Sequence, residues 1–477
     1  MAEIKRLHMG KAQCAIDLGD GSERGEYVDQ DYILNTLGRP VRAISLMTSY
    51  YPLDEGFPKR AHDAFADSDV TFQWDYPYDD YETYKGGLIG NKEAEPFNWM
   101  RDVRRHGMDV CLTITMDPHL DDKHIEAIAD DLATFGRVML RVNHEATGDW
   151  FAFVKRASYE EVAAFYARVC DIFHERAKNV KLILCLDGFK EPGDEKLNME
   201  DIFAEAIKKT DIFSIDRYMS LHWGWPYDVA TKETKNYYRE KVENIYTNGK
   251  RASKRFATVA GEKRIMVLSE MNADGDVTGP YEQCDMLKEF CDMVKNDEEK
   301  WLDAYTFYQF RDRGRLGLET EDPNNANVGI KLPLLDTFIE IINDEYFKQP
   351  IDIEGDETLP VKLRWGSAED SDGVGVEISV EDEPVFFEAY FEDELEDANL
   401  LMEINDRWFY KAKGVKFVDF MPAFFGKTVK GKNLTLKIFA PPATGENDTT
   451  QGDDWRINYY YTLTKLPKIR LEYKSVL

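Results

Sequence analysis

The stretch RVNHEATGDWF, residues 141–151, is the most informative part of this chain. An apolar run of strand length leads into Glu145, and aromatic residues follow it. A second run, RIMVLSEMN at residues 264–272, has Glu270 near its end in the same way. Because the carboxyl ends of parallel strands meet at one rim of a barrel, we expect the two glutamates to face each other across that rim.

Apolar runs of strand length recur eight times between residues 43 and 311, and amphipathic helical segments separate them. One of these helices has a clear start, because Ser158 and Glu161 are spaced as in a capping box. Alternating strands and helices predict a parallel sheet that helices cover, and eight repeats favour a closed (β/α)8 TIM barrel of the α/β class over an open sheet. The predicted strands cover residues 43–51, 69–78, 109–117, 137–145, 181–189, 211–219, 264–272 and 303–311.

The helical period stops after residue 348. Pro350 and Pro360 bracket the acidic, turn-rich run QPIDIEGDETLP, which predicts a linker over residues 349–359. Residues 360–477 contain short alternating runs that are typical of antiparallel strands, about seven of them, and predict a β-sandwich. We therefore expect a catalytic barrel over residues 1–348 and an accessory β-sandwich domain over residues 360–477.

The charge balance argues against two classes of partner. The chain has 90 acidic and 60 basic residues and a net charge of −30, so its surface repels phosphate backbones and anionic lipids. We expect no nucleic acid and no membrane partner. The first residues lack the apolar region of a signal peptide, which predicts a cytoplasmic protein unless a signal has been removed. The oligomeric state does not follow from the sequence.

Side-chain alternation gives the region around Glu145 a chemical interpretation. Arg141, Asn143 and Glu145 are two residues apart, so they share one face of the predicted strand over 137–145. An arginine on an apolar strand must be paired, and carboxylates at the barrel mouth are suitable partners. A buried ion pair with no catalytic role is the alternative interpretation.

Two other short motifs do not match a known type of catalytic or phosphate-binding site. His144 and Glu145 begin like the helix of a zinc protease, but Gly148 stands where the second histidine is needed. The glycine-rich run GDGSERG at residues 19–25 lacks the spacing of a phosphate-binding loop, and no predicted strand precedes it. It is interpreted as a turn.

The segment RVNHEATGDWFAF resembles the acid/base segment of glycoside hydrolase family 26, the β-mannanase family of the clan-A (β/α)8 barrels. Likewise, VLSEMN is similar to the nucleophile strand of that clan, and DIFSIDRYM resembles the sixth strand of the family. The resemblance implies that Glu145 is the acid/base, that Glu270 is the nucleophile and that Tyr218 lies near Glu270. The matching positions of the first segment are Arg141, His144, Glu145, Gly148, Trp150 and Phe151.

The chain departs from the family pattern at positions that bear on specificity. Ala146 and Thr147 stand where the family usually has Met-Asn, and Phe153 stands where it has a tryptophan. The predicted eighth strand offers Phe307 and Gln309 where clan members commonly have a sugar-stacking tryptophan. These changes are compatible with catalysis, and they argue against carrying the mannan specificity of the family over to this chain.

The resemblance implies a retaining glycoside hydrolase that cleaves β-linked glycans or oligosaccharides, of the mannan type or related, by double displacement. Its partner is an oligo- or polysaccharide, and it needs no cofactor and no metal. Each tryptophan near the site is also explained by loop packing. The candidate substrate-binding or supporting residues are Arg141, Asn143, His144, Trp150, Tyr218, Trp223, Trp225, His119 and Asp75.

Two functions of other classes stay open. The barrel could hold a metal-dependent isomerase or hydrolase, because carboxylates and a histidine at strand ends suit a divalent ion. It could also bind carbohydrate without cleaving it. The ligands of the metal alternative would be Glu145, Asp117, His119, Asp187 and Glu270.

Overall fold

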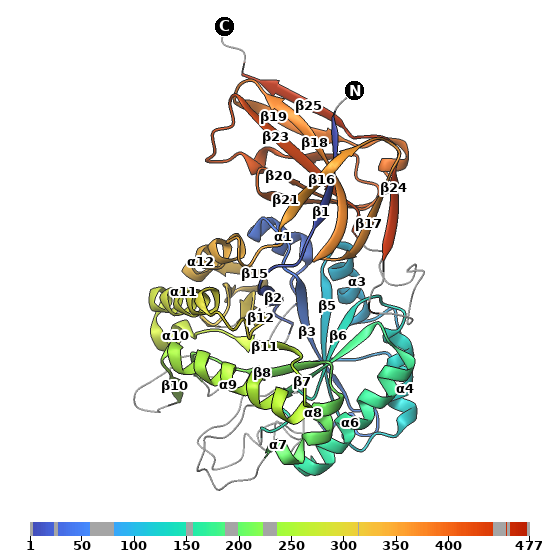
Figure 1. The fold of residues 1–477 in the computed structure, drawn as a ribbon, viewed down its shortest axis with the longest axis vertical. Helices are drawn as coiled ribbons and strands as arrows, with labels where there is room; N and C mark the ends of the chain where they lie inside the picture. The colour runs from blue at the N-terminus through green and yellow to red at the C-terminus, as the bar shows by residue number, and fades with distance from the viewer. Residues whose placement is uncertain are drawn as a thin grey trace.

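The computed structural model describes residues 3–22, 27–57, 81–148, 156–186, 199–222, 236–312, 314–441, 455 and 458–474. It contains a (β/α)8 barrel and, beside one end of the barrel, a domain of antiparallel strands that holds both ends of the chain (Figure 1). The predicted TIM barrel followed by an all-β domain is therefore confirmed.

Eight parallel strands close the barrel, because β2 pairs with both β12 and β3. β2 was not among the predicted strands. The predicted strand over 69–78 lies outside the described residues, and β3 pairs directly with β5, so the barrel closes without it. The strands are β2 (Ala15–Gly19), β3 (Ala43–Tyr50), β5 (Asp109–Met116), β6 (Val138–Val142), β7 (Val180–Leu186), β8 (Ile212–Asp216), β11 (Ile265–Met271) and β12 (Ala304–Phe307).

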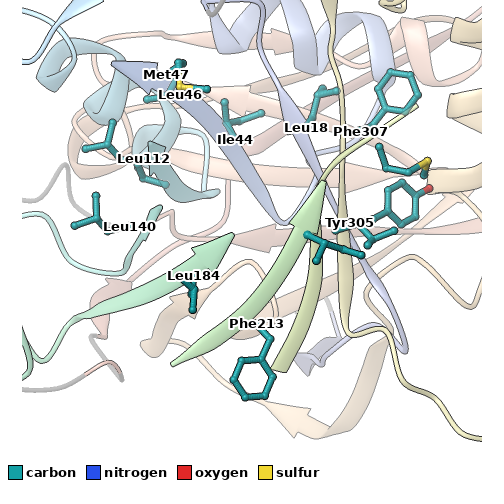
Figure 2. Packing of buried hydrophobic residues seen from close by; sticks show 14 of the residues in the cluster. Leu18, Ile44, Leu46, Met47, Leu112, Leu140, Leu184, Phe213, Tyr305 and Phe307 are labelled. Atoms are coloured by element: carbon teal, nitrogen blue, oxygen red, sulfur yellow. The ribbon is translucent and has the colours of Figure 1, made fainter. Parts of the chain in front are cut away.

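Helices surround these strands. The capping box at Ser158 is confirmed, since its hydroxyl accepts from the Glu161 backbone N–H and the Glu161 carboxylate accepts from the Ser158 N–H. Every second side chain of the strands packs against the helices in one large core, which includes Leu18, Ile44 and Phe307 (Figure 2). The described helices are α1 (Gln30–Leu37), α3 (Phe97–Arg105), α4 (Asp122–Leu132), α6 (Tyr159–Arg176), α7 (Met199–Ile202), α8 (Ala204–Lys209), α9 (Val242–Ala260), α10 (Gly275–Thr278), α11 (Pro280–Asn296) and α12 (Pro333–Ile342).

The alternate side chains point into the barrel and form layers. One residue from each strand builds an apolar layer at the amino end, and Trp455 of the β domain packs against it. Nearer the carboxyl end, small polar side chains fill the interior, and Thr113, Ser214 and Thr306 are buried there. This polar layer leaves space for a charged side chain at the barrel centre.

The β domain consists of two antiparallel sheets with a shared core, to which Phe387, Met402 and Ile438 contribute. One sheet has the order β16-β1-β18-β23-β20-β21 with β17 and β24 attached, and the other has the order β22-β19-β25. The strands are β1 (Ile4–Met9), β16 (Ile351–Glu357), β17 (Val361–Ser367), β18 (Asp370–Val380), β19 (Pro384–Tyr390), β20 (Leu400–Ile404), β21 (Arg407–Lys411), β22 (Phe417–Asp419), β23 (Lys432–Phe439), β24 (Tyr459–Leu463) and β25 (Lys468–Tyr473).

Two details differ from the predicted boundaries of residues 1–348, 349–359 and 360–477. Ile351–Glu357, inside the predicted linker, form β16, and the N-terminal Ile4–Met9 pair with β16 and β18 instead of joining the barrel. The turn-like composition of the linker was misleading, because β16 pairs with β1 and is largely exposed. Only Ile351 and Ile353 alternate with polar residues here, which is too short an alternation to predict a strand.

Short strands lie outside these sheets or extend them: β4 (Glu82–Thr83), β9 (Ser220–His222), β10 (Tyr237–Arg239), β13 (Arg311–Asp312), β14 (Glu319–Asp322) and β15 (Asn325–Lys331). β9 and β13 follow closely after the barrel strands β8 and β12, so they lie on the same side of the barrel as the strand ends. Among the described helices, none has the length and apolar composition to cross a membrane.

Candidate active site

Glu270, near the end of β11, has a donor on each carboxylate oxygen. Arg141 Nη2 donates to Oε1 at 2.8 Å, and the Tyr218 hydroxyl donates to Oε2 at 2.8 Å. The Glu270 side chain is buried, with 6% of its surface exposed. A buried carboxylate with two such donors is held in one orientation. The pairing of Arg141 with Glu270 and the position of Tyr218 agree with the sequence interpretation.

Arg141 stands at the centre of the barrel on β6, fully buried in the polar layer. Its Nε donates to Thr113 Oγ1 at 2.8 Å, and its Nη1 lies 3.5 Å from Asp216 Oδ2. Burial lowers the pKa of this guanidinium, but the charges of Glu270 and Asp216 outweigh that effect and hold the pKa well above its ordinary value. Arg141 is therefore a permanent cation between two carboxylates.

Asp216 was missed by the sequence analysis. It ends β8 next to β11 and is opposite Glu270 in the strand register, and the Arg217 backbone N–H donates to the Glu270 carbonyl at 2.9 Å. A signal was present, because Asp216 and Tyr218 are two residues apart in DIFSIDRYM and alternation places them on one face. The sequence analysis named Tyr218 as a site candidate and did not consider Asp216.

The segment around Glu145 differs from the prediction. β6 ends at Val142, and Asn143 and Glu145 have φ angles of 51° and 48°. The expected common face of Arg141, Asn143 and Glu145 is therefore wrong, since the chain turns after Val142. The turn forms because the Asn143 carboxamide oxygen accepts from the Met116 N–H at 2.7 Å, and because the Ala146 N–H reaches the Cys185 carbonyl at 3.1 Å.

Glu145 itself lies at the barrel rim and is half-buried. Asparagine tolerates the left-handed region, whereas glutamate does so at a cost of about 1–2 kcal/mol. Non-glycine residues held in this region occur preferentially at functional sites. The backbone of Glu145 is therefore strained, as it is at Lys300 and Asp393, with φ angles of 44° and 55°.

His144 is buried beside this turn, with 1% of its surface exposed. Burial, and then the positive charge of Arg141, hold the pKa of its imidazole well below the ordinary value. The ring is therefore neutral at neutral pH. A neutral ring can hold a hydroxyl group as donor or acceptor, and it adds no second positive charge next to Arg141.

His119 lies after β5 on the same rim. Its Nδ1 lies 2.9 Å from Asp117 Oδ1, while Arg156 Nε lies 2.9 Å from Asp117 Oδ2. Half of the His119 side chain is exposed. The structure therefore groups His119 with Asp117 and Arg156, and none of its described contacts joins it to Glu270. The other candidates, Trp150, Trp223, Trp225, Asp75 and Asp187, lie outside the described residues.

The metal alternative receives little support from these contacts. Glu270 and Asp117 both use their oxygens for protein donors. Within the described ranges, the group of three potential metal ligands with atoms less than 4.8 Å apart is His222, Asp274 and Asp276. It shares no residue with the expected ligand set, and the Asp274 carboxylate accepts from the backbone N–H groups of His222 and Asp276.

Comparison with known proteins adds a likeness to carbohydrate-active enzymes. No protein-family model matches the chain, and no curated protein matches its sequence. Solved structures of glycoside hydrolases do match. One is a family 26 β-mannanase from Bacteroides ovatus, with 11% identity, 71% of this chain and 90% of that chain covered, and a TM-score of 0.42. Another is the catalytic domain of a family 26 endo-β-1,4-mannanase from Bacillus sp. JAMB-750, with 16% identity, coverages of 71% and 87%, and a TM-score of 0.41.

A third match is a family 51 α-L-arabinofuranosidase from Bifidobacterium longum, with 9% identity, 90% of this chain and 97% of that chain covered, and a TM-score of 0.43. At these identities and TM-scores, the matches assign no family, activity or substrate to this chain. The function has to be argued from the residues of the site.

Proposed function

We propose that this protein is a retaining glycoside hydrolase that cleaves β-linked glycans or oligosaccharides, of the mannan type or related. Glu270 is the nucleophile and Glu145 the acid/base. The observation that carries the proposal is the buried Glu270 carboxylate, which receives hydrogen bonds of 2.8 Å from both Arg141 and Tyr218. A carboxylate nucleophile has to be fixed in direction before it attacks, and these two donors hold Glu270 in one orientation.

In the first step, the Glu270 carboxylate attacks the anomeric carbon while Glu145 gives its proton to the leaving oxygen. The product is a covalent glycosyl-enzyme. Arg141 and Tyr218 keep Glu270 oriented as the bond forms. In the second step, Glu145, now a carboxylate, takes a proton from water, and the hydroxide breaks the glycosyl–Glu270 bond. Two inversions at the same carbon retain the configuration.

Glu145 suits the acid/base role for two reasons. It follows β6, the third strand before β11 in the barrel order β11-β8-β7-β6, so the two glutamates approach the mouth from different sides. It is half-buried at the rim, where it can exchange protons with water, whereas Glu270 is buried and bonded. The sequence resemblance around Arg141, His144 and Glu145 supports the same assignment.

The test uses aryl β-glycosides with an activated leaving group. We expect wild-type protein to release the β-anomer first. Glu145→Ala should still form the glycosyl-enzyme, because a good leaving group needs little protonation, and azide should then yield the β-glycosyl azide. Glu270→Ala should lose both steps and give at most the α-azide. Glu262→Ala, which changes an exposed glutamate ahead of β11, is the matched control and should keep full activity.

Release of the α-anomer, or a reversed azide pattern in the two variants, would contradict the assignment. Binding of saccharides without turnover of any substrate would instead identify a non-catalytic carbohydrate-binding protein. Loss of activity in a chelator, with recovery on one divalent ion, would favour the metal-dependent alternative.

A further inference from the structure

A small cavity lies beside Glu270 at the carboxyl end of the barrel. Asp20 follows β2 and Gln309 follows β12, and both line this cavity together with Glu270. β2, β12 and β11 are consecutive in the barrel, which explains why residues so far apart in sequence meet here. The cavity has a volume of about 10 Å³, close to the space that one water molecule or one hydroxyl group needs. A sugar ring is too large for it.

Asp20 offers the cavity an acceptor. Only 1% of its surface is exposed. Its carboxylate accepts from the Ser22 hydroxyl at 2.7 Å and from the Val28 N–H at 3.4 Å. In the described part of the chain, no lysine, arginine or histidine forms a salt bridge with it. A buried carboxylate without a cation is costly, so its position next to a nucleophile calls for a reason beyond packing.

Gln309 offers a donor. It is 1% exposed, and its Nε2 has no hydrogen-bond partner among the described residues. An orphan buried donor is unfavourable. The packing here is specific, because a Cβ atom on Gly19 would lie only 3.0 Å from Gln309 Cβ. Glycine at position 19 therefore lets the Gln309 side chain pack against the end of β2.

One hydroxyl group would satisfy both side chains, because it donates one hydrogen bond and accepts others. We propose that this cavity receives a single hydroxyl group of the glycosyl unit that Glu270 attacks, with Asp20 accepting a hydrogen bond from the hydroxyl and Gln309 Nε2 donating one to its oxygen. The inference rests on the proposed function and makes Asp20 and Gln309 residues that select the substrate.

A simpler role for Asp20 is to cap the loop that contains Ser22 and Val28. That role explains the loop hydrogen bonds, and it leaves the Gln309 donor and the shared cavity unexplained. The two roles differ in a measurable way. A capping residue affects all substrates alike, whereas a hydroxyl-binding residue affects only substrates that carry the hydroxyl.

The experiment compares wild type, Asp20→Asn and Gln309→Met of the full chain on one aryl β-glycoside that the wild type cleaves, and on its monodeoxy analogues. Asparagine still accepts the Ser22 hydrogen bonds through its one carbonyl oxygen and gives up the 3.4 Å hydrogen bond from the Val28 N–H. Methionine keeps the length of glutamine without its donor. Asp211→Asn, ahead of β8 at the amino end of the barrel, is the matched control.

For one hydroxyl position, its removal should lower the wild-type kcat/KM on the order of 10- to 100-fold. The same removal should cost each variant less than about 3-fold, because the interaction is already lost. Asp211→Asn should respond like the wild type. A methyl ether at that position should not be cleaved, since the cavity has no space for the methyl group. Equal losses on all analogues would overturn the proposal.

If no glycoside is turned over, binding of glucose, mannose, galactose and xylose is measured by saturation-transfer NMR. A sugar that binds the wild type, and whose binding weakens in both variants, supports the hydroxyl site while the hydrolase function fails. Binding that is the same in all proteins, or no binding at all, overturns the hydroxyl site. Turnover that is identical in the variants overturns the site and leaves the hydrolase function standing.

Discussion

Arg141 and Glu270 form a buried ion pair with 2.8 Å between Nη2 and Oε1, although 129 residues separate them in the chain. The pair joins β6 to β11 across the polar layer of the barrel, and Asp216 lies on the other side of the same guanidinium. Removing the cation therefore leaves two buried carboxylates, whereas removing one carboxylate leaves a balanced pair. The orientation of the Glu270 carboxylate therefore depends on a residue from a distant strand.

Arg141→Met should destabilise the protein by about 3–5 kcal/mol, because it leaves Asp216 and Glu270 buried without their cation. Adding Glu270→Gln should recover about 1–3 kcal/mol, since a neutral amide no longer repels Asp216. Urea denaturation of both single variants and the double variant measures the coupling. Strictly additive effects would show that the three charges do not interact.

Tyr218→Phe should lower kcat/KM by about 10- to 100-fold, which corresponds to the loss of one hydrogen bond to a charged group. Its effect on the free energy of unfolding should be small. Tyr238→Phe is the control, because that hydroxyl bonds to the backbone carbonyl of Tyr218 at 3.3 Å and not to Glu270. Similar kinetic losses in both variants would mean that packing of this loop, not the Glu270 contact, matters.

Glu145→Gly should be more stable than Glu145→Ala by about 1 kcal/mol, while both lose general acid catalysis. Residue 145 has a φ of 48°, where alanine carries a steric cost of about 1–2 kcal/mol that glycine avoids, less the chain entropy of glycine. Thermal unfolding of the two variants under identical conditions gives the difference. An equally stable pair would place residue 145 outside the left-handed region.

Asp20 should make stability depend on pH. Burial raises the pKa of its carboxyl from 3.8 to about 6, against the lowering by the Ser22 and Val28 donors. The contribution of the protonated Asp20 side chain to the free energy of unfolding is therefore fully present below pH 3.8. It is lost as the pH rises through about 6. The loss amounts to roughly 3 kcal/mol at about 1.4 kcal/mol per pH unit.

The variant Asp20→Asn removes this pH-dependent loss of stability, because asparagine does not ionise. We expect it to be more stable than the wild type at pH 8 and equal to it near pH 4, as measured by urea denaturation at both pH values. Asp211→Asn should show the opposite sign. Burial raises the pKa of Asp211, but donation from His174 and the Leu182 N–H outweighs this and lowers it, so its stabilising contribution is present at pH 8. A pH-independent difference for Asp20→Asn would refute the shift.

A fragment of residues 1–348 should aggregate, although it contains both proposed catalytic residues, Glu145 and Glu270. It lacks β16 and β18, the two partners of β1, and it uncovers Leu7, Met9 and Leu34, which pack against Trp365 and Trp408 of the β domain. Unpaired strand edges and apolar patches favour association. Size-exclusion chromatography against a fragment of residues 10–348 tests this. A monomeric, folded 1–348 fragment would show that the unpaired β1 and the uncovered apolar residues do not cause association.

The barrel and its central ion pair follow from the sequence, because long apolar runs and a lone arginine on one of them are strong physical constraints. β2 was not recognised, since AIDLG at residues 15–19 is short and contains an aspartate and a glycine. For the same reason Asp20 was not singled out, and Gln309 was noted only as a departure from a sugar-stacking tryptophan. Without β2 in place, the run after it looked like an isolated turn, and nothing linked it to the end of β12.

The turn at Asn143 was not predictable either. It depends on a side-chain hydrogen bond to the Met116 N–H, a contact between neighbouring strands that no local pattern encodes. β16 and β1 are a similar case, because their pairing joins segments more than 300 residues apart (Figure 1). Local rules identify elements, and long-range pairs decide which sheet each element joins.

That pairing of β1 with β16 has a consequence for synthesis on the ribosome. Ile4–Met9 emerge first, and their partner Ile351–Glu357 emerges only after the whole barrel sequence. At about 5–20 residues per second, the delay is roughly 20 to 70 s. During this time the barrel can fold, while the nascent strand ahead of it has no template and needs protection from other chains. The order of translation thus completes the barrel sequence before the sheet that contains β1 and β16 can form.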